Sequence, residues 1–281
     1  SMNCQVKGET IISPNSTIIK SYAPLNNIYD SIEPYFKAPG NNIIFIDLGN
    51  TVKRLGGSIY NTLTKVNGLT CPTFNHKNIK RLYSFIHNRL HNERDIVSGH
   101  DISDGGFITT LIEMSISSFY GFDVSIHNIN NNVNDFLFSE ELGIILETSV
   151  HSTIIEDIAR EIPELVAYKI GNVVDCDSIK LVYNDNCVLE TNINVMKMCF
   201  EKISYNMELQ QSNEECAVSE LFSIEHRAKY EYNIPFSMGY LEHVKFSTKF
   251  NNVCILRETG SNSDREMAAA FNMSGFTVFE Y

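Results

Sequence analysis

The chain has 281 residues, of which 43% are hydrophobic and 20% are charged, and it contains 15 Gly and 7 Pro. This composition is typical of a folded globular protein and excludes a disordered or fibrous one. Lys and Arg number 22 against 34 Asp and Glu, so the net charge is −12. An acidic chain of this kind is a poor ligand for a phosphate backbone, so we expect no nucleic-acid partner.

The sequence shows no sign of a membrane or secreted protein. It has no apolar run of about 18 residues, and its N-terminus lacks the basic flank and apolar stretch of a signal peptide. We therefore expect a cytoplasmic protein with no membrane partner. The seven cysteines include no C-x-x-C pair, which predicts neither a disulfide framework nor a zinc site. Ser1-Met2 is similar to the remnant of a cleaved affinity tag.

Short apolar runs alternate with helical patterns through the first part of the chain. The run at 42–48 is almost continuously apolar, as expected for a strand that is covered on both faces. Thr153 and Glu156 have the spacing of a capping box. The patterns predict strands at 16–21, 42–48, 96–98, 122–126 and 143–147, and helices at 59–66, 78–90, 107–119, 133–138 and 153–160.

Strands dominate the next part of the chain. They are predicted at 166–170, 179–183 and 187–190, with Asp185-Asn186 as a hairpin turn between the last two. Residues 195–249 begin as a helix, and we expect their second half to be a linker.

The last thirty residues predict a strand at 252–256, a helix at 263–273 and a strand at 277–280. Ser263 and Glu266 have capping-box spacing, and Gly275 is placed where a helix would end. A βαβ unit begins a parallel α/β domain, and one unit alone leaves strand edges uncovered. We therefore expect the chain to stop inside a further domain.

The most informative segment is the polar turn at 98–106, between a predicted strand and a predicted helix. Paired glycines allow close approach of a phosphate, a helix N-terminus faces the anion, and Asp supplies oxygen ligands for Mg²⁺. The alternative is that Asp104 caps the helix while Gly105 and Gly106 shape the turn. Both interpretations fit the sequence Ser98-Gly99-His100-Asp101-Ile102-Ser103-Asp104-Gly105-Gly106 equally well.

Two further turns could carry chemistry. The segment Lys53-Arg54-Leu55-Gly56-Gly57-Ser58 combines cations and glycines before a helix, but it lacks P-loop spacing, and a tight strand-to-helix turn explains it equally well. Glu140-Glu141 could place a carboxylate in a site, although two glutamates before a strand are more often a solvated corner.

Taken in order, these motifs resemble phosphoribosylformylglycinamidine synthase, the glutamine-dependent enzyme family of purine synthesis. The resemblance covers essentially the whole chain after the first two residues. Its specific blocks are His100 to Gly106 and Ile255 to Phe271, and its supporting blocks are Ser13-Pro14, Asp47-Leu48-Gly49, Arg54 to Ser58 and Phe138 to Gly143.

The resemblance implies a fold and a domain layout. The expected class is α/β of the α+β type, a mixed sheet with helices packed on it, as in the C-terminal domain of aminoimidazole ribonucleotide synthetase-like proteins. Residues 1–24 would be the tag remnant and the tail of a preceding synthetase N-terminal domain. Residues 25–249 would be the synthetase-like C-terminal domain with its linker-like end. Residues 250–281 would be the first, truncated βαβ of a class I glutaminase domain.

The resemblance also implies an activity for the whole enzyme. It would be an ATP- and Mg²⁺-dependent ligase that converts formylglycinamide ribonucleotide, glutamine and ATP to formylglycinamidine ribonucleotide, glutamate, ADP and phosphate. The partners of this chain would be the nucleotide and the remaining domains of the same polypeptide. We expect no complete reaction from this chain alone, because most of the enzyme's domains, including the glutaminase nucleophile, would lie outside it.

Site residues follow from the matching blocks. The family's loop borders an auxiliary nucleotide site that holds ADP and magnesium for structure rather than turnover. By resemblance, Asp101 would be a magnesium ligand and Ser103 a nucleotide contact. The residues that shape the loop would be His100, Asp104, Gly105 and Gly106, and those near a phosphate would be Gly56, Gly57 and Ser58. No residue of this chain is assigned a catalytic role.

Two other interpretations stay open at this point. The parent protein could have lost catalysis, which would leave a structural or nucleotide-binding interaction module. The chain could also be a free-standing relative of aminoimidazole ribonucleotide synthetase or selenophosphate synthetase, but the βαβ start has no place in those shorter proteins. The coding sequence after Tyr281 would discriminate among them.

Overall fold

The computed structural model describes residues 3–12, 18–25, 27–49, 51–65, 69–127, 131–226, 232, 233, 235 and 251–281. The chain divides into two compact units, Ser1–Arg227 and Ala228–Tyr281. The predicted tag remnant, residues 1 and 2, and most of the predicted linker lie outside the described residues.

A seven-stranded sheet with the strand order β4-β6-β3-β7-β5-β8-β9 forms the centre of the first unit. β5 and β8 run parallel, and the other neighbouring strands run antiparallel, which confirms the predicted mixed sheet. The strands are β3 (Asn42–Asp47), β4 (Ile96–Asp101), β5 (Gly121–Ile126), β6 (Gly143–Thr148), β7 (Val166–Val174), β8 (Ser178–Tyr183) and β9 (Asn186–Asn192).

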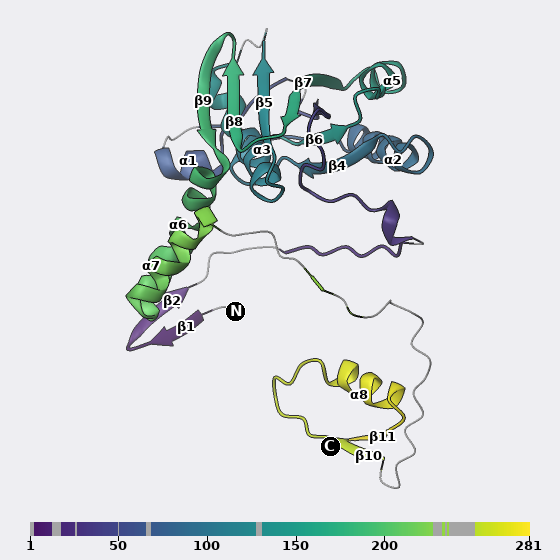
Figure 1. Ribbon diagram of the computed structural model, residues 1–281, viewed down its shortest axis with the longest axis vertical. Helices are drawn as coiled ribbons and strands as arrows, with labels where there is room; N and C mark the ends of the chain where they lie inside the picture. Colours follow the sequence, from purple (N-terminus) through teal and green to yellow (C-terminus); the bar gives the residue numbers. More distant parts are fainter. Residues whose placement is uncertain are drawn as a thin grey trace. The chain divides into compact units, whose positions relative to one another are not determined.

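Helices cover both faces of this sheet (Figure 1). All six residues of β3 are buried, and their side chains alternate between the two faces. Ile43 and Phe45 join one hydrophobic cluster with α3 and α4, whereas Ile44 and Ile46 join a second cluster with α2 and α5. The helices are α1 (Ile59–Thr64), α2 (His76–Asn92), α3 (Gly106–Ile116), α4 (Val133–Phe138), α5 (Ile154–Glu161), α6 (Ile193–Gln211) and α7 (Glu214–Ser223).

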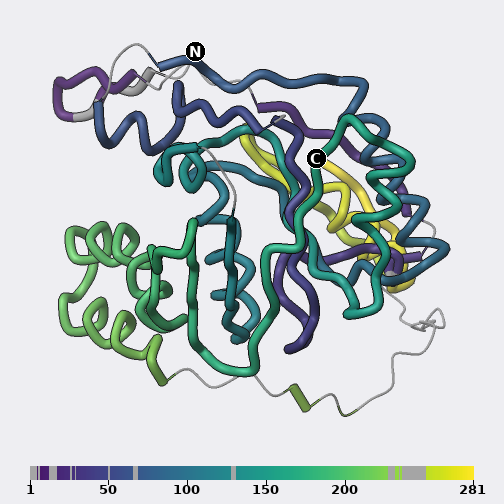
Figure 2. The backbone as a smooth tube through the Cα atoms, turned by 90° about the horizontal axis from the view of Figure 1, so that it is seen from above, coloured from purple at the N-terminus to yellow at the C-terminus, as the bar shows by residue number. Residues whose placement is uncertain are grey.

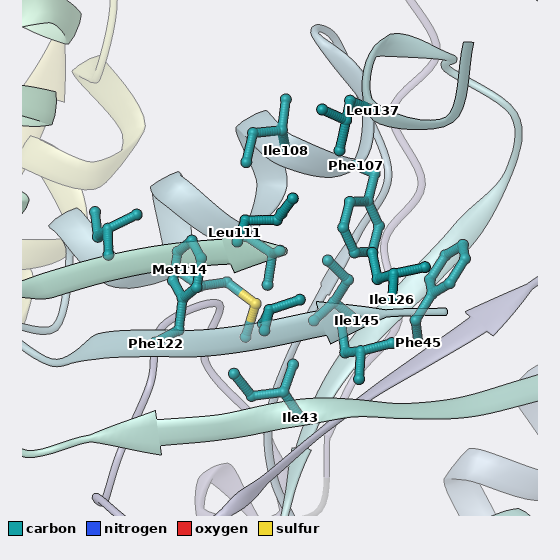
Figure 3. Packing of buried hydrophobic residues seen from close by; sticks show 14 of the residues in the cluster. Ile43, Phe45, Phe107, Ile108, Leu111, Met114, Phe122, Ile126, Leu137 and Ile145 are labelled. Carbon is teal, nitrogen blue, oxygen red and sulfur yellow. The ribbon is translucent and has the colours of Figure 1, made fainter. Parts of the chain in front are cut away.

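The larger cluster lies between α3 and the sheet (Figure 3). Phe107, Leu111 and Met114 from α3 are all at most 2% exposed. The ring of Phe107 packs edge-on against Phe45 of β3, with centroids 5.0 Å apart. This packing fixes the first turn of α3 relative to the end of β3, and therefore positions the loops that follow both strands.

Several short elements lie outside the seven-stranded sheet. β1 (Asn3–Val6) and β2 (Glu9–Ile12) form an antiparallel hairpin, and 3-10 turns occur at Ile28–Asp30 and Ile224–His226. α6 and α7 lie side by side (Figure 2).

The predicted strand at 16–21 is wrong over its described residues, 18–21, which belong to no strand. Ile18 and Ile19 are 80% and 86% exposed. Their apolar side chains are therefore not buried against the sheet, and an extended segment without a partner strand does not form a β-strand.

The second unit confirms the predicted βαβ. β10 (Asn252–Ile255) pairs in parallel with β11 (Thr277–Glu280), and α8 (Asp264–Met273) connects them. Gly275 has a φ of 88°, as a left-handed helix end requires, and its N–H donates to the carbonyl of Asn272. The predicted capping box is wrong, because Ser263 itself adopts a left-handed conformation and makes no side-chain cap.

Two other local predictions need correction. Thr153 precedes α5 without capping it, because its hydroxyl donates to Asp157 and accepts from Arg89. The β8–β9 turn is centred one residue earlier than predicted, since the two residues with positive φ are Asn184 and Asp185. Two consecutive positive φ values are typical of the type I′ turn that matches strand twist. In the described part of the chain, no helix has the length and apolar character needed to span a bilayer.

Candidate functional site

The candidate residues converge on one edge of the sheet because of its topology. β3 and β4 both end at this edge, and β6, which lies between them, begins there. The register pairs Asp47 with Gly143 and Asp101 with Ile144. The turns that follow β3 and β4 and the turn that precedes β6 therefore meet, although they are far apart in the sequence.

The end of β4 presents the predicted metal ligand to solvent. The side chain of Asp101 is 69% exposed, and its Oδ1 lies 3.5 Å from Nδ1 of His100. The nearest partner of His100 Nδ1 is the carbonyl oxygen of Asp101, at 2.7 Å, and Nε2 lies 3.7 Å from a carboxylate oxygen of Glu113. The carboxylate of Asp101 is thus accessible to a cation at the surface.

The turn after β4 owes its shape to two glycines. Gly105 and Gly106 have φ values of 85° and 77°, and the N–H of Gly106 donates to the carbonyl of Ser103 at 3.0 Å. A Cβ on Gly106 would lie 2.7 Å from the carbonyl oxygen of Ser139. The capping alternative for Asp104 is wrong, because Gly105 is the N-cap of α3 and Asp104 is exposed.

The turn that precedes α1 makes hydrogen bonds and close backbone contacts within the chain. The Ser58 hydroxyl caps α1 by accepting from the N–H of Asn61 at 3.1 Å, and it donates to the carbonyl of Leu55 at 2.7 Å. The side chain of Ser58 is thereby turned into the chain, and the residue is 1% exposed. Gly56 is in contact with backbone, since a Cβ there would lie 2.4 Å from the carbonyl oxygen of Thr70. Gly57, with a φ of 80°, is exposed.

The cations of this turn are paired with buried carboxylates. Lys53 Nζ lies 2.9 Å from Asp47, and both side chains are at most 5% exposed. Nη1 of Arg54 lies 2.5 Å from Oε1 of Glu141, which is 2% exposed. Since burial of an unpaired charge is very unfavourable, each carboxylate needs its cation. The buried ammonium of Lys53 is therefore a structural charge.

The expectation of a solvated corner at 140–141 is wrong. Glu141 is buried, and Glu140 is half-buried with its carboxylate turned to the other two turns. Oε1 of Glu140 accepts hydrogen bonds from the N–H groups of Gly105 and Ile59, both at 2.9 Å. This bridging role was missed because the partners are 35 and 81 residues away, and no local pattern reports such a contact.

A family model and several solved structures are similar to this chain. The family model for "AIR synthase related protein, C-terminal domain" matches residues 39–184, which is more than half of the chain. Among solved structures, T. maritima PurL complexed with FGAR overlaps 60% of this chain and 30% of its own, at 16% identity and a TM-score of 0.49. T. maritima PurL complexed with ADP overlaps 88% of this chain and 34% of its own, at 12% identity and a TM-score of 0.45.

Curated relatives match the chain from end to end. The phosphoribosylformylglycinamidine synthase of Drosophila melanogaster is 30% identical over 100% of this chain and 22% of its own length. The human protein of the same name is 28% identical over 100% of this chain and 21% of its length. The chain thus spans about a fifth of these relatives. Since the family model covers most of the sheet and the turns at its edge, the chain belongs to the AIR synthase related protein, C-terminal domain family.

Proposed function

We propose that this chain is the part of a phosphoribosylformylglycinamidine synthase that borders a nucleotide site. The whole enzyme would use ATP and ammonia from the hydrolysis of glutamine to convert formylglycinamide ribonucleotide to formylglycinamidine ribonucleotide. The observation that carries the proposal is the match of the entire chain to curated relatives with that name. Because the chain corresponds to about a fifth of them, its partners would be the remaining domains of the same polypeptide.

The geometry at the sheet edge supports a nucleotide held through a metal ion. Asp101 offers an exposed carboxylate, and Ser103 follows it in the same turn. In the part of the chain that the structure describes, no group of three His, Cys, Asp or Glu side chains could hold a metal ion. Mg²⁺ characteristically binds one or two carboxylates and takes its other ligands from phosphates and water, which suits a single carboxylate such as Asp101.

The glycines would have an indirect role in this site. The N–H groups of Gly105 and Gly106 already donate to Glu140 and Ser103, and Ser58 is engaged by Leu55 and Asn61. We therefore assign the metal contact to Asp101 and the nucleotide contact to Ser103. Gly56, Gly105 and Gly106 would shape the turns and would lie close to the phosphates without donating to them, because their N–H groups donate within the chain. Gly57 would also lie close to the phosphates.

Calorimetric titration of this chain with ADP, with and without Mg²⁺, tests the assignment. We expect binding that Mg²⁺ strengthens and that loses this enhancement in Asp101→Asn. Asp123→Asn is the matched control, because Asp123 is an exposed carboxylate on β5. ADP binding that is indifferent to Mg²⁺ and to Asp101→Asn would contradict the metal role. Absence of ADP binding in the wild-type chain would contradict the nucleotide site itself.

A further inference from the structure

Glu140 joins the two glycine-rich turns through a single carboxylate oxygen. Oε1 accepts from the N–H of Ile59, the first residue of α1, and from the N–H of Gly105, the N-cap of α3. Both distances are 2.9 Å. One side chain thus fixes the position of the turn after β3 relative to the turn after β4.

The neighbours of Glu140 reinforce the same connection. The ring of Phe138 stacks on Tyr60 of α1, with centroids 4.9 Å apart and planes 16° apart. The hydroxyl of Ser139 donates to the carbonyl of Arg54 at 2.9 Å, and Glu141 pairs with the Arg54 side chain. Residues 138–141, the bridging segment, therefore hold the α1 turn by its backbone and by its side chains.

The bridging segment also contacts the α3 turn closely. The Cα of Gly106 faces the backbone of residues 137–139, so closely that a Cβ would come within 2.9 Å of three backbone atoms. α3 has no cap from its own N-cap side chain, since that residue is Gly105. The carboxylate of Glu140, from another part of the chain, accepts instead from the N–H of this N-cap residue, as the glutamate of a capping box does, and a negative charge near a helix N-terminus is favourable.

We propose that Glu140 is a positioning residue for the nucleotide site: it holds the α1 turn and the α3 turn in one relative placement and so fixes where Asp101 and Ser103 meet their ligand. This inference rests on the proposed function for its ligand, but the coupling of the two turns does not. Since a carboxylate and an amide both present an oxygen at Oε1, Glu140→Gln keeps both hydrogen bonds, whereas Glu140→Ala loses both.

Hydrogen exchange of the full chain measures the coupling directly. In Glu140→Ala we expect peptides covering 54–62 and 103–110 to exchange faster together, by about tenfold each, as loss of one hydrogen bond at each turn implies. Glu140→Gln should stay close to wild type in both peptides. Glu156→Ala, an exposed glutamate of α5, is the control and should change neither. Faster exchange in one peptide alone, or equal effects of Glu140→Ala and Glu140→Gln, would overturn the proposal.

Titration with ADP and Mg²⁺ tests the consequence for the ligand. We expect Glu140→Ala to weaken binding about tenfold while Glu140→Gln restores it to near the wild-type value, with both variants folded by circular dichroism. Equal affinities of the wild-type chain and Glu140→Ala would overturn the positioning role. If the wild-type chain binds no ADP, the proposed function fails at this site, and the exchange experiment still decides whether Glu140 couples the turns.

Discussion

The guanidinium of Arg89 on α2 forms a bidentate ion pair with the carboxylate of Asp95. Its Nε and Nη2 lie 2.9 and 2.7 Å from the two carboxylate oxygens. Its third nitrogen, Nη1, lies 2.6 Å from Asp157 of α5. One 7%-exposed cation therefore ties together the end of α2, the start of β4 and the first turn of α5. The network lies on the sheet face opposite α3, away from the candidate site.

Loss of this cation should destabilise the chain strongly. Arg89→Ala would leave the partly buried Asp95 without a cation and Asp157 with only the exposed Arg160, which costs about 3–5 kcal/mol. The matched control is Arg81→Ala on the same helix, because Arg81 and Glu164 are 44% and 54% exposed and such pairs contribute at most about 1 kcal/mol. Urea unfolding measures both. Equal losses in the two variants would show that burial of the Arg89 network does not matter for stability.

Acid should weaken the same network. The Arg89 guanidinium, followed by the Thr153 hydroxyl, lowers the pKa of Asp157 from 3.8 to about 2. Because the folded-state pKa is the lower one, the contribution of Asp157 to stability is complete above pH 3.8 and is lost as the pH falls toward 2.

Asp157→Asn tests this pH dependence. We expect the variant to be less stable near neutral pH and to lose less of its remaining free energy of unfolding between about pH 5 and pH 2.5 than the wild-type chain does. Urea unfolding across that range is the measurement. If the free energy of unfolding of Asp157→Asn falls as steeply with decreasing pH as that of the wild-type chain, other carboxylates cause the acid sensitivity.

Gly56 should tolerate substitution less well than its neighbour. A Cβ at Gly56 would lie 2.4 Å from the backbone of Thr70, so Gly56→Ala should cost about 3 kcal/mol through overpacking. At Gly57 the nearest atom would be 3.7 Å away, and only the left-handed conformation opposes Ala, at about 1–2 kcal/mol. Thermal unfolding of the two variants should rank them in this order, and the reverse order would contradict the close contact with Thr70.

The core under α3 should show the usual contrast between buried and exposed leucines. Leu111 is 0% exposed, so Leu111→Ala should cost about 2–5 kcal/mol from lost burial and a residual cavity. Leu63 is 76% exposed, and Leu63→Ala should change stability by less than about 0.5 kcal/mol. Chemical denaturation of both variants checks the assignment, and a comparable loss at Leu63 would contradict its exposed position.

The local spacing of hydrophobic residues was sufficient to predict most of the secondary structure. The continuous apolar run of β3, the periodicity of α3 and the final βαβ all follow from near-neighbour spacing, because burial on one face or on both imposes a period on the sequence. Some predictions failed because a distant partner intervened. Thr153 does not cap α5 since its hydroxyl is bound by Arg89 and Asp157.

The candidate site was likewise predictable only in part. The positions of the glycines, carboxylates and hydroxyls in the turns, and the placement of Asp101 and Ser103 in one strand-to-helix turn, could be predicted because they depend on adjacent residues. The position of β6 between β3 and β4, and the bridge that Glu140 makes between Ile59 and Gly105, could be seen only in the folded chain. Strand order and such contacts depend on which distant segments bury each other's surfaces, and that free energy is not encoded in the spacing of neighbouring residues.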